Sequence, residues 1–267
     1  MEKQLKGIPE TLLIPLWARA VESKQSNPII KDVKAIEMVK QIDYDFTKFE
    51  TEWPTQMSIA IRTEILDNAT KAYFRNHANA VVINIGCGLD TRFSRLDNGT
   101  VQWYDLDLPE SIRLRRKFFK ENDRYKMIAK SVFDYSWIDE ITNKKHVLLI
   151  AEGIFMYFRK NEVLKILYNL IEAFKGAEML IETIPPSLVK QSRKQDLVKK
   201  QYQMDAQFNW GVKNGKELEK LNKQIKFIEE WHYFDYHRDR WKIIRWLSLI
   251  PFFKNRFGNR IIHVKFI

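Results

Sequence analysis

An apolar run that ends in a glycine turn constrains this chain more than any other feature. Residues 81–85 read Val-Val-Ile-Asn-Ile, and Gly86-Cys87-Gly88 follows at once. A run rich in β-branched residues is typical of a strand that is buried on both faces inside a parallel sheet. Glycine lets the backbone turn sharply and come close to a ligand. The run therefore predicts the first strand of an α/β sheet, with a binding site at its carboxyl end.

A second short apolar run, 101–106, leads into the acidic residues Asp105 and Asp107. An ionised carboxylate only accepts hydrogen bonds, so at this strand end it can accept both hydroxyls of a ribose. A dinucleotide fingerprint needs a third glycine, but Thr91 stands at that position, and Asp90 would repel a phosphate. A nucleoside without phosphates, such as S-adenosylmethionine, therefore fits this site better than NAD or FAD.

Four segments, in order along the chain, carry a resemblance to a known family: Leu16–Ser23 with Asn27-Pro28 and Lys31-Asp32, Ile61–Asp67, Asn84–Arg92, and Ala151–Phe158. They resemble the N-terminal segment, the Arg-bearing helix, the glycine motif and the fourth-strand signature of the leucine carboxyl methyltransferase family. A looser likeness lies at 261–266. That family joins protein phosphatase methyltransferases to bacterial small-molecule O-methyltransferases of the tetracenomycin polyketide type. The resemblance implies a Rossmann-like class I methyltransferase that uses S-adenosylmethionine.

The resemblance also assigns residues to parts of the cofactor. Gly86 and Gly88 would bring the backbone close to the methionine portion, and Asp107 would bind the ribose hydroxyls. Asp105 is the alternative for the ribose, or else a strand-end residue that holds a neighbouring loop. Arg62 would pair with the cofactor carboxylate, because a guanidinium offers a bidentate fork and stays charged; the alternative is a surface salt bridge on a helix.

The remaining predicted site residues follow the third and fourth strands. Ser131 and Val132 would contact adenine, while Asp134 and Trp137 are expected to cap and pack the next turn. Glu152 is the predicted catalytic carboxylate, because it would accept a hydrogen bond from the cofactor ammonium and lie near the sulfonium charge. Tyr157 is expected to border the methyl acceptor, and the neighbouring Phe155 and Met156 are expected to lie in the core.

The hydrophobic pattern predicts one domain over 1–267, made of an N-terminal helical segment (1–75), a cofactor-binding core (76–183), and lid helices with final antiparallel strands (184–267). Strands are expected at 81–86, 101–106, 126–131, 146–152, 177–183, 224–234 and 259–266, and helices at 109–121, 160–174, 187–210 and 239–250. Strands that alternate with helices indicate right-handed crossovers and a mostly parallel sheet, of seven strands in this fold class. The polar segment 187–215 is expected to form a lid. Five aromatic residues are candidates for an apolar acceptor pocket or for the core: Phe208, Trp210, Trp231, Tyr233 and Phe234.

Composition narrows the class of protein. The formal net charge is +11, and the basic run from Arg113 to Lys117 is interpreted as a solvated helix face. No zinc-ligand spacing, RNA-binding aromatic motif or membrane-spanning run is present, so we expect no metal, no nucleic acid and no membrane span. The single cysteine, Cys87, is interpreted as a small packing residue near the ligand. We expect a cytoplasmic protein.

These observations predict an S-adenosylmethionine-dependent O-methyltransferase that acts on a carboxylate or hydroxyl of a small, polyketide-like molecule. A carboxylate acceptor needs no base, whereas a phenol does. Spacing gives no partner to His232, His237 or His263, so we name no general base. The alternatives are a protein carboxyl methyltransferase, a basic binding module without catalysis, and an RNA methyltransferase suggested only by the net charge. The acceptor and the oligomeric state do not follow from the sequence.

Overall fold

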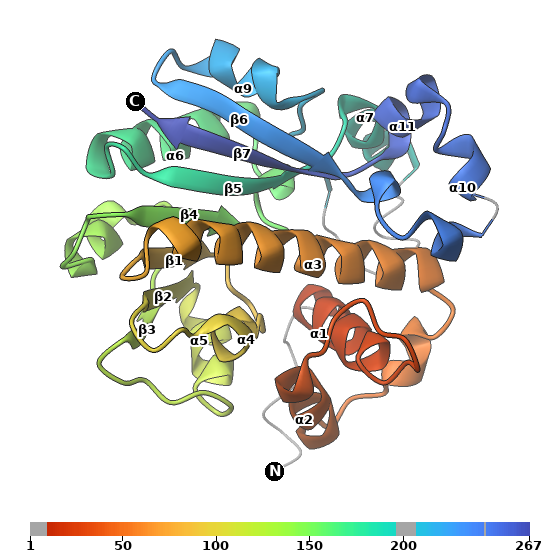
Figure 1. Cartoon of the computed structure of the whole chain (residues 1–267), viewed down its shortest axis with the longest axis horizontal. Helices are drawn as coiled ribbons and strands as arrows, with labels where there is room; N and C mark the ends of the chain where they lie inside the picture. Colours follow the sequence, from red (N-terminus) through yellow and green to blue (C-terminus); the bar gives the residue numbers. More distant parts are fainter. Residues whose placement is uncertain (1–9, 196–206, 243) are drawn as a thin grey trace.

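A single sheet of seven strands forms the centre of the computed structural model, which describes residues 10–195, 207–242 and 244–267. The strand order is β3-β2-β1-β4-β5-β7-β6 (Figure 1). Strands β1 to β5 pair in parallel, while β7 runs antiparallel to both of its neighbours. The strands are β1 (Val81–Ile85), β2 (Gln102–Asp107), β3 (Tyr125–Ala129), β4 (Val147–Ala151), β5 (Glu178–Thr183), β6 (Ile225–His232) and β7 (Arg260–Phe266). The prediction of a mostly parallel seven-stranded sheet is confirmed.

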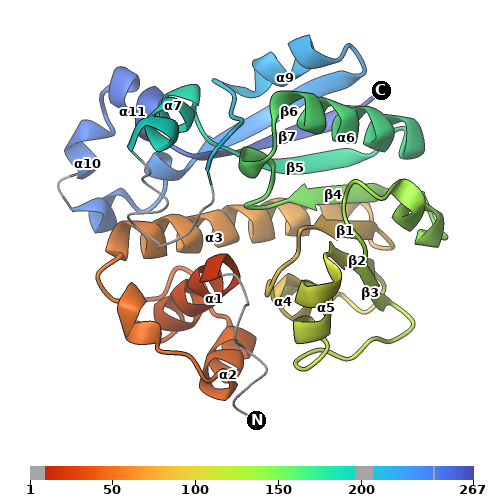
Figure 2. The same cartoon turned by 180° about the vertical axis from the view of Figure 1, so that it is seen from behind.

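Helices cover both faces of this sheet (Figures 1 and 2). One face carries α1 (Glu10–Glu22), α2 (Val33–Gln41) and the long α3 (Trp53–Asn76), and the other carries α6 (Lys160–Ala173). The other α-helices of the described residues are α4 (Arg92–Leu96), α5 (Pro109–Arg115), α7 (Pro186–Gln195), α9 (Gly215–Leu221), α10 (Ile244–Leu247) and α11 (Pro251–Phe257). Short 3-10 turns are η1 (Phe46–Phe49), η2 (Tyr135–Glu140), η3 (Phe155–Tyr157), η4 (Tyr233–Asp235) and η5 (Arg238–Trp241). Within the described ranges, no helix combines the length and apolar composition that a membrane crossing needs.

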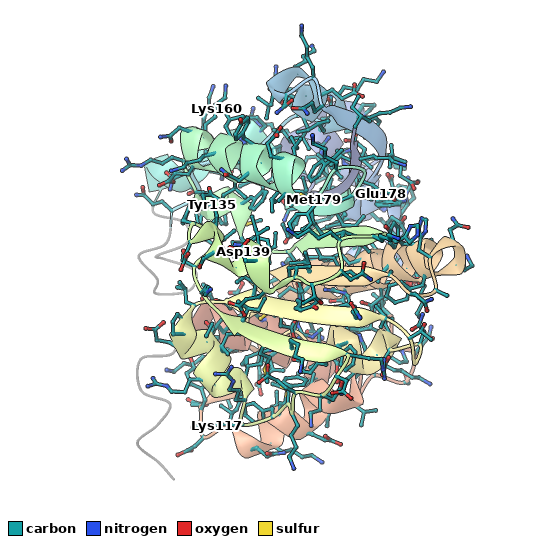
Figure 3. The ribbon with its side chains drawn as sticks, turned by 90° about the vertical axis from the view of Figure 1, so that its left-hand side faces the viewer. Lys117, Tyr135, Asp139, Lys160, Glu178 and Met179 are labelled. Atoms are coloured by element: carbon teal, nitrogen blue, oxygen red, sulfur yellow. The ribbon has the colours of Figure 1, made fainter. Side chains whose placement is uncertain are left out.

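The period-two alternation of the strands divides the core into two layers. Val82 of β1 packs in the layer under α3, while its neighbours Val81 and Ile83 pack in the layer under α6. At the start of β5, Met179 is fully buried, whereas the adjacent Glu178 reaches the surface and binds His263 (Figure 3). Both layers need apolar side chains, which is why the central strands lack a polar face.

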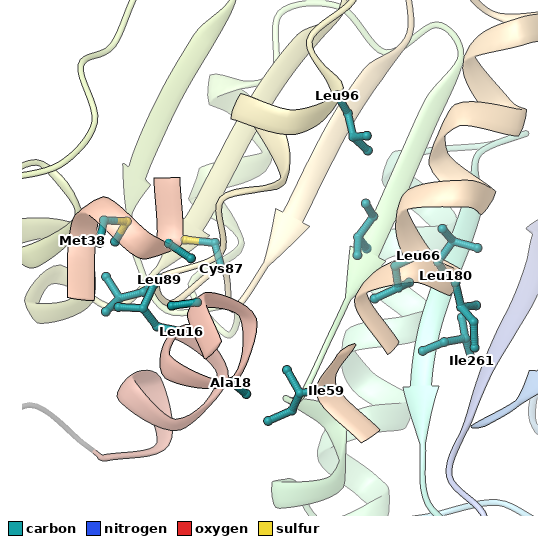
Figure 4. Packing of buried hydrophobic residues seen from close by; sticks show 14 of the residues in the cluster. Leu16, Ala18, Met38, Ile59, Leu66, Cys87, Leu89, Leu96, Leu180 and Ile261 are labelled. Carbon is teal, nitrogen blue, oxygen red and sulfur yellow. The ribbon is translucent and has the colours of Figure 1, made fainter. Parts of the chain in front are cut away.

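The glycine turn after β1 packs against the N-terminal helices. Cys87 and Leu89 lie beside Leu16 of α1 and Met38 of α2 (Figure 4). Burial raises the pKa of the Cys87 thiol well above its usual value. Cys87 therefore packs as a small apolar residue, as predicted, and is poorly suited to be a nucleophile.

Several predicted boundaries differ from the structure. The helix expected over 109–121 ends at Arg115. Of the helix expected over 187–210, the structure shows Pro186–Gln195; residues 196–206 lie outside the described part of the chain, and residues 207–210 are not helical. The insert expected over 239–250 extends to Phe257 as η5, α10 and α11. The interpretation of the basic run as a solvated face is wrong for Arg115, which is fully buried. Asp134 caps η2 through Ser136 N–H and Trp137 is buried, as expected.

Candidate active site

A cavity of about 790 Å³ lies at the carboxyl ends of the parallel strands. Strand β1 lies at the centre of this edge, between β2 on one side and β4 on the other. The strand order changes direction at β1, and open α/β sheets bind ligands at such a point. All eight predicted site residues line it: Arg62, Gly86, Gly88, Asp107, Ser131, Val132, Glu152 and Tyr157. The structure therefore brings residues from α3 and from four strand ends to one place.

The glycine turn is held in a conformation that favours glycine. Gly86 has φ of +68° and Gly88 has φ of +47°, both in the left-handed region. A Cβ atom on Gly86 would lie 2.5 Å from Cδ1 of Ile154, and one on Gly88 would lie 2.9 Å from Cδ2 of Leu12. The backbone N–H groups of Gly86 and Cys87 both donate to the carbonyl of Leu106 in β2. The turn is thus fixed to the neighbouring strand and leaves no room for larger residues.

Asp107 joins the second strand to this turn. Its Oδ2 accepts a hydrogen bond from Gly88 N–H at 2.7 Å, and its Oδ1 accepts one from Leu108 N–H at 2.7 Å. Burial raises the pKa of Asp107, although the two backbone donors and a hydrogen bond from the Ser111 side chain act in the opposite direction. A carboxylate has about four acceptor positions, so one stays open to a ligand hydroxyl, and a second hydroxyl would take the position that Ser111 occupies.

Asp105 has a different environment, although it lies only two residues away. It is fully buried and accepts hydrogen bonds from Arg115 Nε at 2.9 Å and from Tyr125 Oη at 2.6 Å. The same Arg115 donates from Nη1 to the carbonyl of Gly88 at 3.0 Å. Asp105 does not line the cavity, so of its two predicted roles the structure favours the one that holds a neighbouring loop.

A network of buried ion pairs lies directly under the cavity. Arg62 pairs with Glu152 at 2.7 Å and with Glu182 at 2.9 Å, and Arg92 pairs with Glu152 at 2.7 Å. Among the described residues, the network contains four guanidinium groups and five carboxylates: Arg19, Arg62, Arg92 and Arg95, with Asp32, Asp67, Asp90, Glu152 and Glu182. Its formal charge is therefore negative. The alternative of a surface salt bridge for Arg62 is wrong, because the residue is 9% exposed.

Glu152 is held as an anion within this network. Burial opposes its ionisation, but Arg62 and Arg92 outweigh burial and lower the pKa of Glu152. Oε1 of Glu152 is paired with Arg62 and Oε2 with Arg92. A guanidinium has five N–H donors, and the ion pairs with Glu152 and Glu182 use only part of that capacity in Arg62. The Nε atom of Arg62 is buried and has no hydrogen-bond partner within the described residues.

Part of the cavity wall is apolar. Val132 is buried there, while Leu108 and Phe133 expose 51% and 38% of their surface. Phe133 packs edge-on against Phe158, with ring centroids 4.9 Å apart. Flat, exposed apolar surface beside Asp107 fits a nucleobase attached to the ribose that Asp107 would bind. Sequence reasoning missed Leu108 and Phe133, whose exposure is the signal and is visible only in the structure.

One face of α1 lines the remaining wall. Thr11, Leu12, Pro15 and Arg19 follow helical spacing and reach the cavity together. Tyr157 of η3 also lines the cavity and packs against Phe208, with centroids 5.5 Å apart. The prediction that α1 belongs to a family motif gave no hint of this wall, because the helix contacts the site through residues mostly outside that motif.

The five aromatic residues considered for the acceptor pocket are absent from the cavity wall that the structure describes. Trp210, Tyr233 and Phe234 are buried in the core, and Tyr233 Oη donates to Glu182 at 2.8 Å. From the segment 187–215, Gln207 and Asn209 line the cavity instead. The three C-terminal histidines also lie outside this wall and contact Glu230, Glu64 and Glu178. The described residues hold no cluster of His, Cys, Asp and Glu suited to a metal ion.

Comparison with known proteins places the chain in a family. Residues 13–171 match the leucine carboxyl methyltransferase family. The chain is also 30% identical over 270 residues to the tetracenomycin polyketide synthesis O-methyltransferase TcmP of Streptomyces glaucescens, and the match covers 98% of both chains. This chain belongs to the leucine carboxyl methyltransferase family. It is a methyltransferase family, so the resemblance of the four sequence segments is confirmed.

Two further relatives agree with this membership. The chain is 27% identical to the S-adenosyl-L-methionine-dependent methyltransferase dpfgK of Gibberella zeae, over 84% of this chain and 82% of dpfgK. The crystal structure of a putative methyltransferase from Thermobifida fusca superposes with a TM-score of 0.58, at 12% identity and with 94% of each chain covered. The second similarity shows the fold, and the prediction of a class I methyltransferase fold is confirmed.

Proposed function

We propose that this protein is an S-adenosylmethionine-dependent O-methyltransferase that methylates a carboxylate or hydroxyl of a small, polyketide-like molecule. The observation that carries the proposal is the single cavity in which Asp107, the glycine turn and the Arg62–Glu152 pair meet. Support comes from the relatives, since TcmP is named as a polyketide O-methyltransferase and dpfgK as an S-adenosylmethionine-dependent one.

The residues fit the cofactor group by group. Asp107 would accept the ribose hydroxyls, and Val132 with Leu108 and Phe133 would enclose adenine beside Ser131. Gly86 and Gly88 would let the methionine portion lie against the backbone. When bound, S-adenosylmethionine supplies a methyl group activated by its sulfonium. Its net charge is positive, which complements the negative formal charge of the buried network.

Arg62 and Glu152 have distinct roles in this proposal. Arg62 would bind the cofactor carboxylate with N–H donors that its ion pairs leave over. Glu152 would attract the ammonium and the sulfonium through its charge. Because the pKa of Glu152 is lowered and both its oxygens are paired, it is a poor proton acceptor. Its contribution to catalysis is therefore electrostatic.

The acceptor would bind between Tyr157 and the cavity face of α1. Thr11, Leu12 and Pro15 give this wall a mostly apolar surface, and Asn209 adds an amide. Such a wall suits a planar organic molecule with few charges. Alignment of the acceptor oxygen with the methyl group and exclusion of water are the tasks left to these residues.

The proposal is tested by calorimetric titration with S-adenosylmethionine and S-adenosylhomocysteine. Wild type should bind both, and Asp107→Asn should weaken binding by roughly a hundredfold, because charge-assisted hydrogen bonds to two hydroxyls are worth about 3 kcal/mol together. Asp139→Asn, an exposed carboxylate on η2, is the matched control and should bind as wild type. Absence of binding to a folded wild-type protein would refute the cofactor assignment.

Transfer of a radiolabelled methyl group then separates the acceptor classes. Aromatic polyketide acids and phenols form one panel, and peptides that end in leucine form the other. A base-labile product indicates an ester and a base-stable product indicates an ether. Methylation of the peptides alone would replace the small-molecule assignment with a protein carboxyl methyltransferase. Cofactor binding without transfer to any acceptor would favour a non-catalytic binding module.

A further inference from the structure

The strongest unexplained surface feature lies in the insert between β6 and β7. The described part of the chain exposes eleven large hydrophobic side chains, and five of them lie within residues 246–252: Trp246, Leu247, Leu249, Ile250 and Phe252. Trp246 is 61% exposed and Phe252 is 73% exposed. Contiguous exposed apolar side chains mark a surface that contacts another body. We call α10, α11 and the residues between them the apolar protrusion (residues 244–257).

The protrusion is well anchored on its inner side. Phe253 of α11 packs against Phe234, with centroids 5.9 Å apart, and against Phe257 at 4.9 Å. The carbonyl of Arg256 accepts a hydrogen bond from the hydroxyl of Ser187 at the start of α7. The two helices therefore have an inner face that belongs to the fold. Their outer apolar face has no such role.

Exposed cations lie beside this outer face. Residues 240–267 contain no Asp or Glu, and Arg245 and Arg256 are exposed. The preceding Asp235 pairs with Lys254 of α11, and Lys242 lies over the ring of Trp53 in α3. The guanidinium of Arg245 lies 4.7 Å from the ring centroid of Trp246, and that of Arg256 lies 5.9 Å from that of Phe252. Aromatic rings beside cations are typical of segments that lie at the interface of an anionic membrane, with the rings among the headgroups and the cations at the phosphates.

The position of the protrusion links it to the active-site edge. Strand β7 is antiparallel to both β5 and β6, so β6 ends at the same edge of the sheet as β5. The protrusion follows β6 and therefore leaves the sheet at the edge that holds the cavity. Figure 1 shows α10 and α11 at that end of the molecule, beyond the end of α3.

We propose that the apolar protrusion docks the protein onto the surface of an anionic lipid bilayer. Trp246, Leu249 and Phe252 enter the headgroup region, and Arg245 and Arg256 bind the lipid phosphates. The helices have 4 and 7 residues, so they lie on the bilayer and do not cross it. The orientation brings the edge of the sheet that holds the cavity toward the membrane.

Charge favours a bilayer over a second copy of the chain. A two-fold dimer through this surface would place the protrusion of one copy against that of the other. The exposed cations of both copies would then face one another with no acidic residue of the protrusion between them. Anionic lipid, by contrast, supplies the missing negative charge. Each cation near such a surface contributes roughly fivefold to binding.

The test is co-sedimentation with sucrose-loaded vesicles of phosphatidylcholine alone and of phosphatidylcholine mixed with phosphatidylglycerol. Wild type should bind the mixed vesicles at least about tenfold better, and added salt should weaken binding. The double variant Trp246→Ser/Phe252→Ser should lose at least about tenfold in binding, because two aromatic side chains no longer enter the interface. Arg245→Gln/Arg256→Gln should lose about 25-fold on mixed vesicles.

The matched control is Tyr168→Ser on α6, which removes an aromatic side chain that is 57% exposed elsewhere on the surface. It should bind vesicles as wild type does. Circular dichroism melts verify that each variant is folded. Failure of folded wild type to bind mixed vesicles, or equal binding by the Trp246/Phe252 double variant, would overturn the proposal. A wild-type dimer that this double variant converts to a monomer in light scattering would assign the surface to self-association instead.

Discussion

Replacing Arg92 by methionine tests how much stability the protein loses when one cation is removed from the buried network. The Arg92 side chain is fully buried and lies 2.8 Å from Asp67, 2.9 Å from Asp90 and 2.7 Å from Glu152. Methionine keeps much of the apolar stem but leaves three carboxylates with one cation fewer. Each of them retains another partner: Arg95 near Asp67 and Asp90, and Arg62 near Glu152.

Removing one member of a buried ion pair costs about 3–5 kcal/mol, because an uncompensated charge stays in a low-dielectric environment. The retained partners place Arg92→Met toward the lower part of that range. For a chain of this length the melting temperature should fall by about 10 °C. The control is Arg124→Met, which removes an exposed pair with Asp97 and should leave the midpoint nearly unchanged, since water screens that pair.

The assay is urea unfolding followed by circular dichroism across a range of pH. Arg92 and its neighbours lower the pKa values of Asp90 and Glu152 below the ordinary values of 3.8 and 4.5, although burial opposes this. A carboxylate with a lowered pKa stabilises the folded state above its ordinary pKa, and this contribution is lost as the pH falls through the folded-state pKa. The difference between wild type and variant should therefore shrink in acid. A loss below about 1 kcal/mol at neutral pH, or a difference independent of pH, would refute the reasoning.

Three other outcomes follow from single contacts. Gly86→Ala should lower the free energy of unfolding in urea by about 1 kcal/mol more than Gly99→Ala does, and it should also weaken cofactor binding. Both glycines have positive φ, but a Cβ on Gly86 would press against Ile154, whereas a Cβ on Gly99 would meet open space. Affinity for S-adenosylhomocysteine should fall on acidification, and the fall should begin at a pH above the ordinary pKa of an aspartate. The reason is that burial raises the pKa of Asp107 and that a protonated carboxyl group accepts fewer hydrogen bonds from hydroxyls. Calorimetry that shows constant affinity down to about pH 4 would contradict this. Tyr233→Phe should cost about 1–2 kcal/mol, since it removes a hydrogen bond to a buried carboxylate, and an unchanged urea midpoint would exclude that contribution.

Local sequence patterns were sufficient to predict the strands of the sheet and the residues at its carboxyl edge. Apolar runs located all seven strands to within two residues at each end. The Gly86-Cys87-Gly88 turn and the position of Asp107 predicted where the cavity lies, because parallel strands bring their carboxyl ends to one edge. Helix ends were less certain: the helix that begins at Pro109 stops at Arg115, after which the chain turns back toward β3.

Long-range pairing could not be predicted from the sequence. Asp105 and Asp107 look equivalent in the chain, yet Arg115 and Tyr125 bury the first while the cavity receives the second. Arg115 itself lies in a basic run that resembled a solvated face. Its burial depends on the carboxylate of Asp105, ten residues earlier, and no periodic pattern of charges in the sequence predicts that pairing.

The same limit applies to the second half of the glycine motif. The sequence indicated only that Asp90 would repel a phosphate, whereas the structure places Asp90 and Arg92 in the ion network beneath the cavity. Desolvation offsets much of what such ion pairs contribute to folding, so the intact network adds little net stability, although removing one of its members is costly. Fixed charges that are already desolvated and oriented need no reorganisation when a charged ligand arrives, which is the advantage of a preorganised site. The motif thus combines a turn that approaches the ligand with the ion pairs that hold the turn in place, and the two contributions differ in experiment: Gly86→Ala should weaken cofactor binding as well as stability, whereas Arg92→Met should act mainly on stability.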